Sequence, residues 1–198
     1  MKLGSYRDRL LRASREDTFW SRSQLSLHTT VYLFAMRVLM RREVTTRFLE
    51  VGCGDAILCK EVRKLGVAHI IGMDFDDAHL ALARKNVPEG KFLWRDILEK
   101  TTRFSADVVA FPNVLGYFTL AQLQDVLQRT TAPWVLLNVC VSDCTEKVPI
   151  WIGAEYRLQA YPQSQYEQVF RQSGYTVDNC MLVDWEKIEA FYILRSSK

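Results

Sequence analysis

The chain has 198 residues, 48% of them hydrophobic, and a formal net charge of +3. Its length and apolar content predict a single domain, residues 1–198, with a sizeable core. The longest apolar run, Thr30 to Met40, is interrupted by Arg37 and is too short to span a membrane, which takes about 20 apolar residues. Residues 1–20 alternate charged and apolar types, so no signal peptide is expected, and the protein is predicted to be soluble and cytoplasmic.

The charge is unevenly distributed along the chain. Residues 1–47 contain ten Lys and Arg against four Asp and Glu, whereas the remainder contains sixteen against nineteen. A basic N-terminal region is suited to nucleic acid or to another anionic substrate. The favoured interpretation is that these arginines form the solvated faces of amphipathic helices, which leaves nucleic acid open as a partner that is not favoured.

Two helices are predicted first, from Tyr6 to Phe19 and from about Ser23 to Met40, as an N-terminal cap over residues 1–45. Strands and helices alternate from residue 46 onward. The predicted strands are 46–51, 69–74, 91–95, 106–111, 133–139, 176–183 and 188–194. The predicted helices are 56–65, 77–86, 120–129 and 163–172. This alternation predicts a doubly wound α/β core over residues 46–198, with a mostly parallel seven-stranded sheet, helices on both faces and an antiparallel edge strand.

The first strand of this core runs into a glycine turn. Residues 48–56 read Phe-Leu-Glu-Val-Gly-Cys-Gly-Asp-Ala, and a helix pattern follows at once. Gly52 and Gly54 lack a Cβ, so the backbone can turn sharply and approach a ligand closely. The junction of strand, glycine turn and helix is where α/β proteins hold nucleotide-like cofactors.

The residues around the turn disfavour a dinucleotide. The third glycine of the G-x-G-x-x-G fingerprint is replaced by Ile57, and carboxylates flank the turn at Glu50 and Asp55. These carboxylates would repel a pyrophosphate, but they suit a ligand with a sulfonium or ammonium group and neutral hydroxyls. An NAD-dependent oxidoreductase is therefore the more distant alternative.

Polar residues follow the next three strands. Asp74 ends the strand 69–74, about 20 residues past the turn, where an acid can accept hydrogen bonds from both ribose hydroxyls. Asp96 follows the strand 91–95, and Asn113 follows the strand 106–111. The carboxyl ends of parallel strands are where ligands of open α/β sheets collect.

At these positions the chain resembles the class I S-adenosylmethionine-dependent methyltransferases, which have a Rossmann-like core. The matching segments are Leu49-Glu-Val-Gly-Cys-Gly-Asp55, Ile71-Gly-Met-Asp74, Arg95-Asp96-Ile97 and Asp107-Val-Val-Ala-Phe-Pro-Asn-Val-Leu115. The resemblance covers roughly residues 45–195. It implies S-adenosyl-L-methionine as the cofactor and S-adenosyl-L-homocysteine as its product, but it says little about the substrate, because this cofactor half serves many chemistries.

The resemblance also implies roles for individual residues. The turn would lie under the methionine and ribose, Asp74 would hold the ribose diol, and Asn113 would face the methionine end or the methyl group. Asp96 with Ile97 would meet the adenine amino group, and Phe75 would lie against the adenine. The alternative for Asp96 is to cap the short turn that follows it, and the alternative for Phe75 is an ordinary place in the core or at its rim. The residues expected to bind the cofactor are Glu50, Gly52, Cys53, Gly54, Asp74, Phe75, Asp96, Ile97 and Asn113.

The substrate side is expected outside the core. The segment at about 141–161 is dense in aromatic residues and is interpreted either as a lid or, with equal weight, as a β-extension buried against the sheet edge. His28 is the histidine best placed to act as a base, and Tyr156 is a second catalytic candidate. The candidate substrate contacts are Trp20, Tyr117, Trp151, Tyr156 and Arg157.

The predicted function is methyl transfer to a nitrogen or oxygen of a small molecule. Phe111-Pro-Asn-Val114 lacks the Asn/Asp-Pro-Pro-Tyr/Phe box of enzymes that methylate amino groups of bases, which counts against a nucleic-acid N6-adenine methyltransferase. The alternatives are a methyltransferase for a protein or structured RNA and a non-catalytic cofactor-binding module. No metal site and no membrane association are expected, and the chain is predicted to be a monomer or homodimer.

Overall fold

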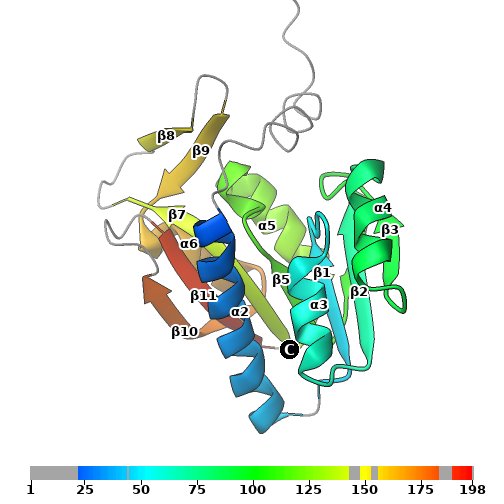
Figure 1. The fold of residues 1–198 in the computed structure, drawn as a ribbon. Coiled ribbons are helices and arrows are strands. Elements are labelled where there is room, and N and C mark those ends of the chain that lie inside the picture. Colours follow the sequence, from blue (N-terminus) through cyan, green and yellow to red (C-terminus); the bar gives the residue numbers. More distant parts are fainter. Residues whose placement is uncertain (1–21, 44, 143–147, 153–155, 183–188, 198) are drawn as a thin grey trace, which may run out of the picture.

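The computed structural model describes residues 22–43, 45–142, 148–152, 156–182 and 189–197 (Figure 1). The predicted helix at 6–19 and the candidate substrate residue Trp20 lie outside the described residues. Helix α2, Arg22–Arg42, corresponds to the second predicted helix.

The sheet contains the seven strands that the sequence predicts. Along its main path the strand order is β10-β11-β7-β5-β1-β2-β3. Strands β3, β2, β1, β5 and β7 pair in parallel, whereas β11 is antiparallel to both β7 and β10, so an antiparallel pair forms that edge. The strands are β1 Arg47–Val51, β2 His69–Asp74, β3 Lys91–Trp94, β5 Val108–Phe111, β7 Trp134–Val141, β10 Tyr175–Leu182 and β11 Glu189–Ser196.

Two further strands extend this sheet. Strands β8, Val148–Ile152, and β9, Tyr156–Tyr161, form an antiparallel pair, and the end of β9 pairs in parallel with the end of β7. The described part of the 141–161 segment thus has the β-extension form, and it projects beyond the sheet (Figure 1). Its action as a lid stays a prediction. A separate pair is formed by β4, Phe104–Ser105, and β6, Thr130–Thr131.

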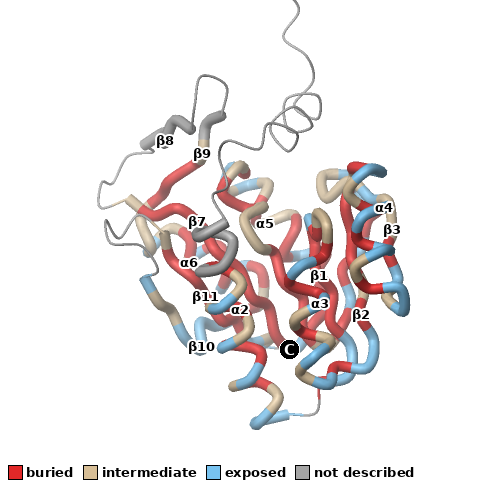
Figure 2. The backbone as a smooth tube through the Cα atoms, viewed as in Figure 1, coloured by how far each residue is buried: buried red, intermediate tan, exposed pale blue. Residues whose placement is uncertain are grey.

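Helices cover both faces of the sheet and divide the core in two (Figure 2). Helix α2 packs on one face together with α3, Ile57–Lys64, and α4, Asp77–Asn86. The other face carries α5, Leu120–Gln128, and α6, Gln163–Gln172, beside the 3₁₀ turn η1, Leu115–Tyr117. Successive residues of the strands alternate between these two clusters, which explains why the central strands read as continuous apolar runs.

Local sequence explains where the helices begin. Asp76 caps α4 by accepting a hydrogen bond from the Ala78 N–H, and Thr119 forms a capping box with Gln122 at the start of α5. Helix α3 begins differently, because its N-cap residue, Ala56, is in the left-handed conformation and provides no side-chain cap. None of the helices in the described ranges is long and apolar enough to cross a membrane.

Candidate functional site

The turn after β1 is clamped to the end of β2. The backbone N–H groups of Gly52 and Cys53 both donate to the Met73 carbonyl, at 2.7 and 3.0 Å. Gly52 and Gly54 have φ angles of 73° and 51°. A Cβ at Gly52 would lie 2.4 Å from Cγ2 of Val114, so both conformation and space require glycine there. The backbone of the turn therefore lies against the segment that follows β5.

Glu50 joins this turn to α3. Its Oε2 accepts a 2.9 Å hydrogen bond from the Cys59 N–H and so provides the acceptor that the N-terminus of α3 otherwise lacks. Burial raises the pKa of Glu50 to about 8, although the bond from Cys59 favours the carboxylate. Burial also raises the pKa of the neighbouring Cys53 thiol well above its ordinary value, so this side chain is a neutral thiol rather than a nucleophile.

Asp74 joins the turn to the loop before α4. Its Oδ2 accepts from the Gly54 N–H and its Oδ1 from the Asp76 N–H, both at 2.9 Å. The carboxylate is buried. Each carboxylate oxygen can accept a second hydrogen bond, so these contacts leave acceptor capacity for ligand hydroxyls. The structure thus places the Asp74 carboxylate at the glycine turn. Its binding of the ribose stays a prediction.

The loop after β3 carries the predicted adenine contacts. Asp96 Oδ1 accepts a 2.8 Å hydrogen bond from the Leu98 N–H, which is the capping contact foreseen as its alternative role. The Ile97 carbonyl accepts from Arg129 Nη2 at 2.8 Å. Phe75 is half-buried, and its carbonyl accepts from the indole N–H of Trp94. The adenine roles of Asp96, Ile97 and Phe75 stay predictions.

Arg129 holds that loop in place. Its guanidinium donates to the carbonyls of Ile97, Glu99 and Thr102 and pairs with the carboxylate of Asp125 at 2.9 Å. The Arg129 side chain is 8% exposed and also lies over the Phe104 ring. The planar fork of arginine is suited to several fixed acceptors at once.

Asn113, which follows β5, is held by a second asparagine, Asn138, from the middle of β7. Its N–H donates to Asn138 Oδ1 at 2.8 Å, and its Oδ1 accepts from Asn138 Nδ2 at 2.7 Å. Asn113 has φ 57°, a left-handed conformation that asparagine tolerates. The Tyr32 hydroxyl donates to Asn138 Oδ1 at 2.8 Å and so ties helix α2 to the pair. Burial raises the pKa of Tyr32, which keeps its hydroxyl protonated as a donor.

His28 belongs to the same network. Its Nε2 lies 2.7 Å from Oε2 of Glu189, and Asn138 Nδ2 donates to the other oxygen, Oε1. The His28 and Glu189 side chains are 10% and 19% exposed. The network therefore runs from α2, through the first residue of β11 and the middle of β7, to Asn113 after β5.

The predicted substrate residues are only partly described. Tyr117 is half-buried in η1 against the core. Trp151 and Arg157 are paired along the backbone in the β8–β9 register, and Tyr156 begins β9, but the side chains of all three lie outside the described residues. A Cβ at Gly116 would lie 3.2 Å from the Leu158 side chain, so η1 packs against β9. The structure thus brings Tyr117 close to the strand that begins at Tyr156.

Four residues of the site were not singled out in the sequence. Asn138 is a lone amide within the apolar run Trp134–Val141, and a buried polar group in such a strand has to find partners. A polar residue alone in an apolar strand is therefore a signal that could have identified Asn138. Its partners Tyr32 and Glu189 are distant in sequence, and no local pattern marks them. Arg129 likewise follows α5 without a pattern that marks it.

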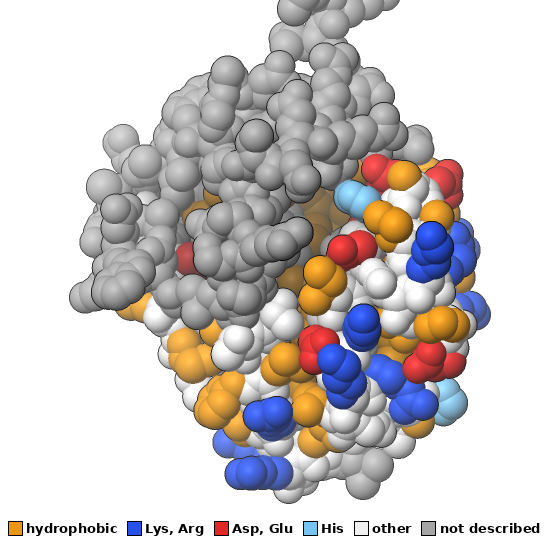
Figure 3. All heavy atoms as spheres, in the orientation of Figure 1, with side chains coloured by type: hydrophobic (Ala, Val, Ile, Leu, Met, Phe, Trp, Pro, Cys, Tyr) orange, Lys and Arg blue, Asp and Glu red, His pale blue; other side chains and the backbone are white. Residues whose placement is uncertain are grey.

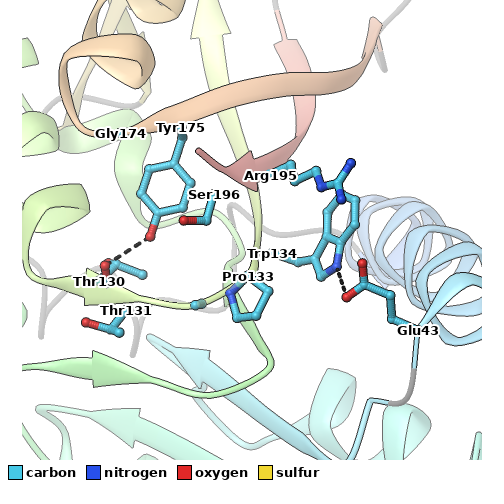
Figure 4. A pocket seen from close by; sticks show the side chains of 10 residues that line it. Glu43, Thr130, Thr131, Pro133, Trp134, Gly174, Tyr175, Arg195 and Ser196 are labelled. Atoms are coloured by element: carbon cyan, nitrogen blue, oxygen red, sulfur yellow. Dashed lines mark hydrogen bonds between the residues drawn. The ribbon is translucent and has the colours of Figure 1, made fainter. Parts of the chain in front are cut away.

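A pocket of about 400 Å³ lies at the end of the strands opposite to the glycine turn (Figure 4). Trp134, the first residue of β7, donates there from its indole N–H to Glu43, and Tyr175 donates to the Thr130 carbonyl. The pocket lies at the amino end of β7 and shares no residue with the glycine turn. Its lining consists of Glu43, Thr130, Thr131, Ala132, Pro133, Trp134, Gly174, Tyr175, Arg195 and Ser196.

Comparison with known proteins agrees with the resemblance. Residues 48–132 match the family model of a methyltransferase domain. A ubiquinone biosynthesis O-methyltransferase from Brucella melitensis is 32% identical over 136 residues, covering 63% of this chain and 54% of that protein. A ribosomal protein L11 methyltransferase from Thermotoga neapolitana is 25% identical over 125 residues, covering 61% and 46%. The chain thus spans about half the length of the curated relatives it matches.

The same fold occurs in a solved methyltransferase. Magnesium protoporphyrin IX methyltransferase from Synechocystis PCC 6803, with bound S-adenosylhomocysteine, superposes with a TM-score of 0.68 at 13% identity, covering 96% of this chain and 94% of that one. The predicted class I, Rossmann-like methyltransferase fold is therefore confirmed.

Proposed function

We propose that this chain, a member of the S-adenosylmethionine-dependent methyltransferase family, transfers a methyl group from that cofactor to a nitrogen or oxygen of a small molecule. The observation that carries the proposal is the juxtaposition of three strand ends. The Gly52 turn, the buried Asp74 carboxylate and the Asn113 segment lie together, because Asp74 bonds the turn and Val114 packs on it.

The residues present fit this cofactor. Gly52 keeps the backbone open to close approach, and Asp74 retains acceptor capacity for hydroxyls. We expect the turn and Asp74 to hold the methionine and ribose parts, and Asp96 with Ile97 to meet the base. When bound, S-adenosylmethionine supplies an electrophilic methyl group on a positively charged sulfur. The chain's own contribution is to hold the acceptor atom close and in line with that group.

A small acceptor is favoured over a macromolecule. On the described part of the face that carries α2, α3 and α4, Lys and Arg side chains are interspersed with Asp and Glu (Figure 3). Such mixed charge differs from the single-sign field that nucleic acid favours. The name of the Brucella relative also supports a small acceptor. A protein acceptor is the second candidate, and the name of the Thermotoga relative is the observation that supports it.

Transfer of label from S-adenosylmethionine tests the proposal. The purified chain is incubated with methyl-tritiated cofactor and either a small-metabolite extract or its protein and RNA fractions, with Gly52→Val as the matched control. We expect acid-soluble labelled product from the metabolite extract with the wild type alone. Label only in precipitable protein or RNA would support the macromolecular alternative. S-adenosylhomocysteine binding without any transfer would support a non-catalytic module.

A further inference from the structure

We propose that Arg129 is a positioning residue that makes the site select adenine, because it holds the loop after β3 in the place where Asp96 can accept from the base. This inference rests on the proposed function and deepens it, since it concerns how the same cofactor is recognised. Its basis is a nearly buried guanidinium whose N–H groups are all engaged by the protein.

Every N–H group of the Arg129 guanidinium has an acceptor. Nη1 donates to the carbonyls of Glu99 and Thr102, at 3.1 and 2.9 Å. Nη2 donates to the Ile97 carbonyl at 2.8 Å and to Oδ2 of Asp125 at 2.9 Å, and Nε donates to the same Asp125 oxygen at 3.1 Å. These contacts occupy all five donors of an arginine side chain. No donor remains for a ligand, so Arg129 acts through the loop that it holds.

The loop at residues 96–103 depends on Arg129 for its attachment. Inside the loop, the N–H of Glu99 and the hydroxyl of Thr102 donate to the Asp96 carbonyl, at 3.2 and 3.0 Å. These bonds close the turn but do not connect it to another element. Among the described residues, the hydrogen bonds that reach the middle of the loop from outside it come from Arg129. The carboxylate of Asp125 fixes the direction of the guanidinium, so the loop is tied to helix α5.

The held loop presents an open acceptor and an open donor on consecutive residues. Asp96 is half-buried, and its Oδ1 is engaged by the Leu98 N–H at 2.8 Å. Within the described part of the chain, no group donates to Oδ2 of Asp96 and none accepts from the Ile97 N–H. The capping contact therefore leaves the second carboxylate oxygen for a ligand, so the two roles foreseen for Asp96 are compatible.

This pattern is complementary to one edge of adenine. The base carries an amino group, which donates, beside the ring nitrogen N1, which accepts. In hypoxanthine a carbonyl replaces the amino group and N1 carries a hydrogen, so the donor and the acceptor are exchanged. A site that reads a base through hydrogen bonds rejects such an analogue, because its own polar groups are then left unpaired. Selection of adenine requires Asp96 and Ile97 to stay in place, and Arg129 keeps them there.

A comparison of two ligands separates this role from a general loss of structure. S-adenosylhomocysteine and S-inosylhomocysteine differ only in the base, and each is titrated calorimetrically into the folded variants. Arg129→Lys keeps the positive charge but loses the planar fork that serves several acceptors at once. Arg171→Lys is the matched control, because Arg171 is exposed on α6 and its ion pair with Glu167 is long, at 4.0 Å. Asp74→Asn is the second comparison, because it alters the predicted ribose contact, which the two ligands share.

The expected result is a loss of selectivity in Arg129→Lys. We expect the wild type to bind S-adenosylhomocysteine at least about tenfold more tightly than S-inosylhomocysteine. In Arg129→Lys the affinity for S-adenosylhomocysteine should fall about tenfold or more, whereas that for the inosine compound should change by less than about threefold. Asp74→Asn should weaken both ligands by a similar factor and retain the preference for adenine, and Arg171→Lys should behave as the wild type.

A substitution at Asp125 provides a test that does not depend on the stability of Arg129→Lys. The Asp125 side chain is 42% exposed on α5, where leucine is readily accommodated in a helix. Asp125→Leu removes the acceptor of Nε and Nη2 and leaves the guanidinium without the carboxylate that directs it. We expect the preference for adenine to fall at least about threefold in this variant.

Three results would overturn the inference while the proposed function stands. One is a folded Arg129→Lys variant that retains the wild-type preference, another is an equal loss of affinity for both ligands, and the third is a wild type that binds both ligands alike. If Arg129→Lys does not fold, an unchanged preference in Asp125→Leu overturns the inference instead. If the wild type binds neither ligand, the proposed function itself falls, and this inference falls with it.

Discussion

The side-chain amide of Asn138, in the middle of β7, makes two hydrogen bonds to Asn113, which follows β5. Asn138 Nδ2 donates to Asn113 Oδ1 at 2.7 Å, and the Asn113 N–H donates back to Asn138 Oδ1 at 2.8 Å. The same Asn138 oxygen also accepts from the Tyr32 hydroxyl. One buried amide thus fixes the left-handed residue at the site and connects it to helix α2.

Replacing Asn138 with leucine, which has nearly the same shape, should therefore be costly. The change leaves the backbone N–H of Asn113 without its acceptor and removes the amide donor to Asn113 Oδ1 and Glu189 Oε1, whereas the Tyr32 hydroxyl keeps the Phe111 carbonyl at 3.1 Å. Each buried group left unsatisfied costs about 1–3 kcal/mol. We expect urea unfolding to show a loss of roughly 3 kcal/mol or more and a weaker affinity for S-adenosylhomocysteine. The matched control is Asn179→Leu, in an exposed position of β10, which should change stability by less than about 0.5 kcal/mol. Equal effects of the two changes would refute the role of the network.

Asp74→Asn tests the predicted ribose contact. The asparagine keeps one oxygen for the backbone but loses the charge, and hydrogen bonds to charged groups contribute about 1.5–3 kcal/mol. We therefore expect S-adenosylhomocysteine affinity to fall roughly tenfold to a hundredfold in calorimetry. Asp77→Asn, in the exposed first turn of α4, should bind as the wild type does. Unchanged affinity in a folded Asp74→Asn variant would exclude the ribose assignment.

The buried Glu50 should make stability depend on pH. Its folded-state pKa of about 8 lies above the ordinary value of 4.5, so the native state holds this proton more tightly than the unfolded chain does. The contribution is fully present below about pH 4.5 and is lost as the pH rises through about 8. We expect the free energy of unfolding of the wild type to fall relative to Glu50→Gln across this range, by at most about 1.4 kcal/mol per pH unit. Parallel stability profiles for the two proteins would show that Glu50 does not titrate in this way.

Arg129 should be sensitive to a change that keeps its bulk. In Arg129→Met the carbonyls of Ile97, Glu99 and Thr102 lose their shared donor. We expect a loss of about 3 kcal/mol in chemical denaturation, since unsatisfied buried groups cost about 1–3 kcal/mol each. Arg171→Met, on the exposed side of α6, is the control because its ion pair is long and solvent-exposed. A variant as stable as the wild type would show that water replaces the guanidinium.

Sequence patterns predict the order and type of the core elements well. The strand 69–74 and the helices 77–86 and 163–172 have the predicted bounds, because alternation, caps and glycines mark them locally. The strand predicted to begin at residue 106 starts instead at Val108. Asp107 precedes it and accepts hydrogen bonds from the backbone N–H groups of Thr46 and Arg47, a long-range contact that no local pattern reveals.

The residues of the site likewise differ in how far the sequence predicts them. The sequence predicts the topology of the strands that lead to Gly52, Asp74 and Asn113. Their convergence at the carboxyl ends of these strands could therefore be anticipated. The partnership of His28 with Glu189 joins residues 161 positions apart, and only tertiary packing determines it. The sequence likewise does not decide whether β8 and β9 join the sheet, because apolar and aromatic residues suit a lid and a strand pair equally.

Calorimetric titration with S-adenosylmethionine, S-adenosylhomocysteine and NAD tests the central claim most directly. The glycine turn, the Asp74 carboxylate and the absent third glycine predict micromolar binding of both adenosyl compounds and no binding of NAD. A well-folded protein that binds neither adenosyl compound, or that binds NAD instead, would contradict the assignment of this site.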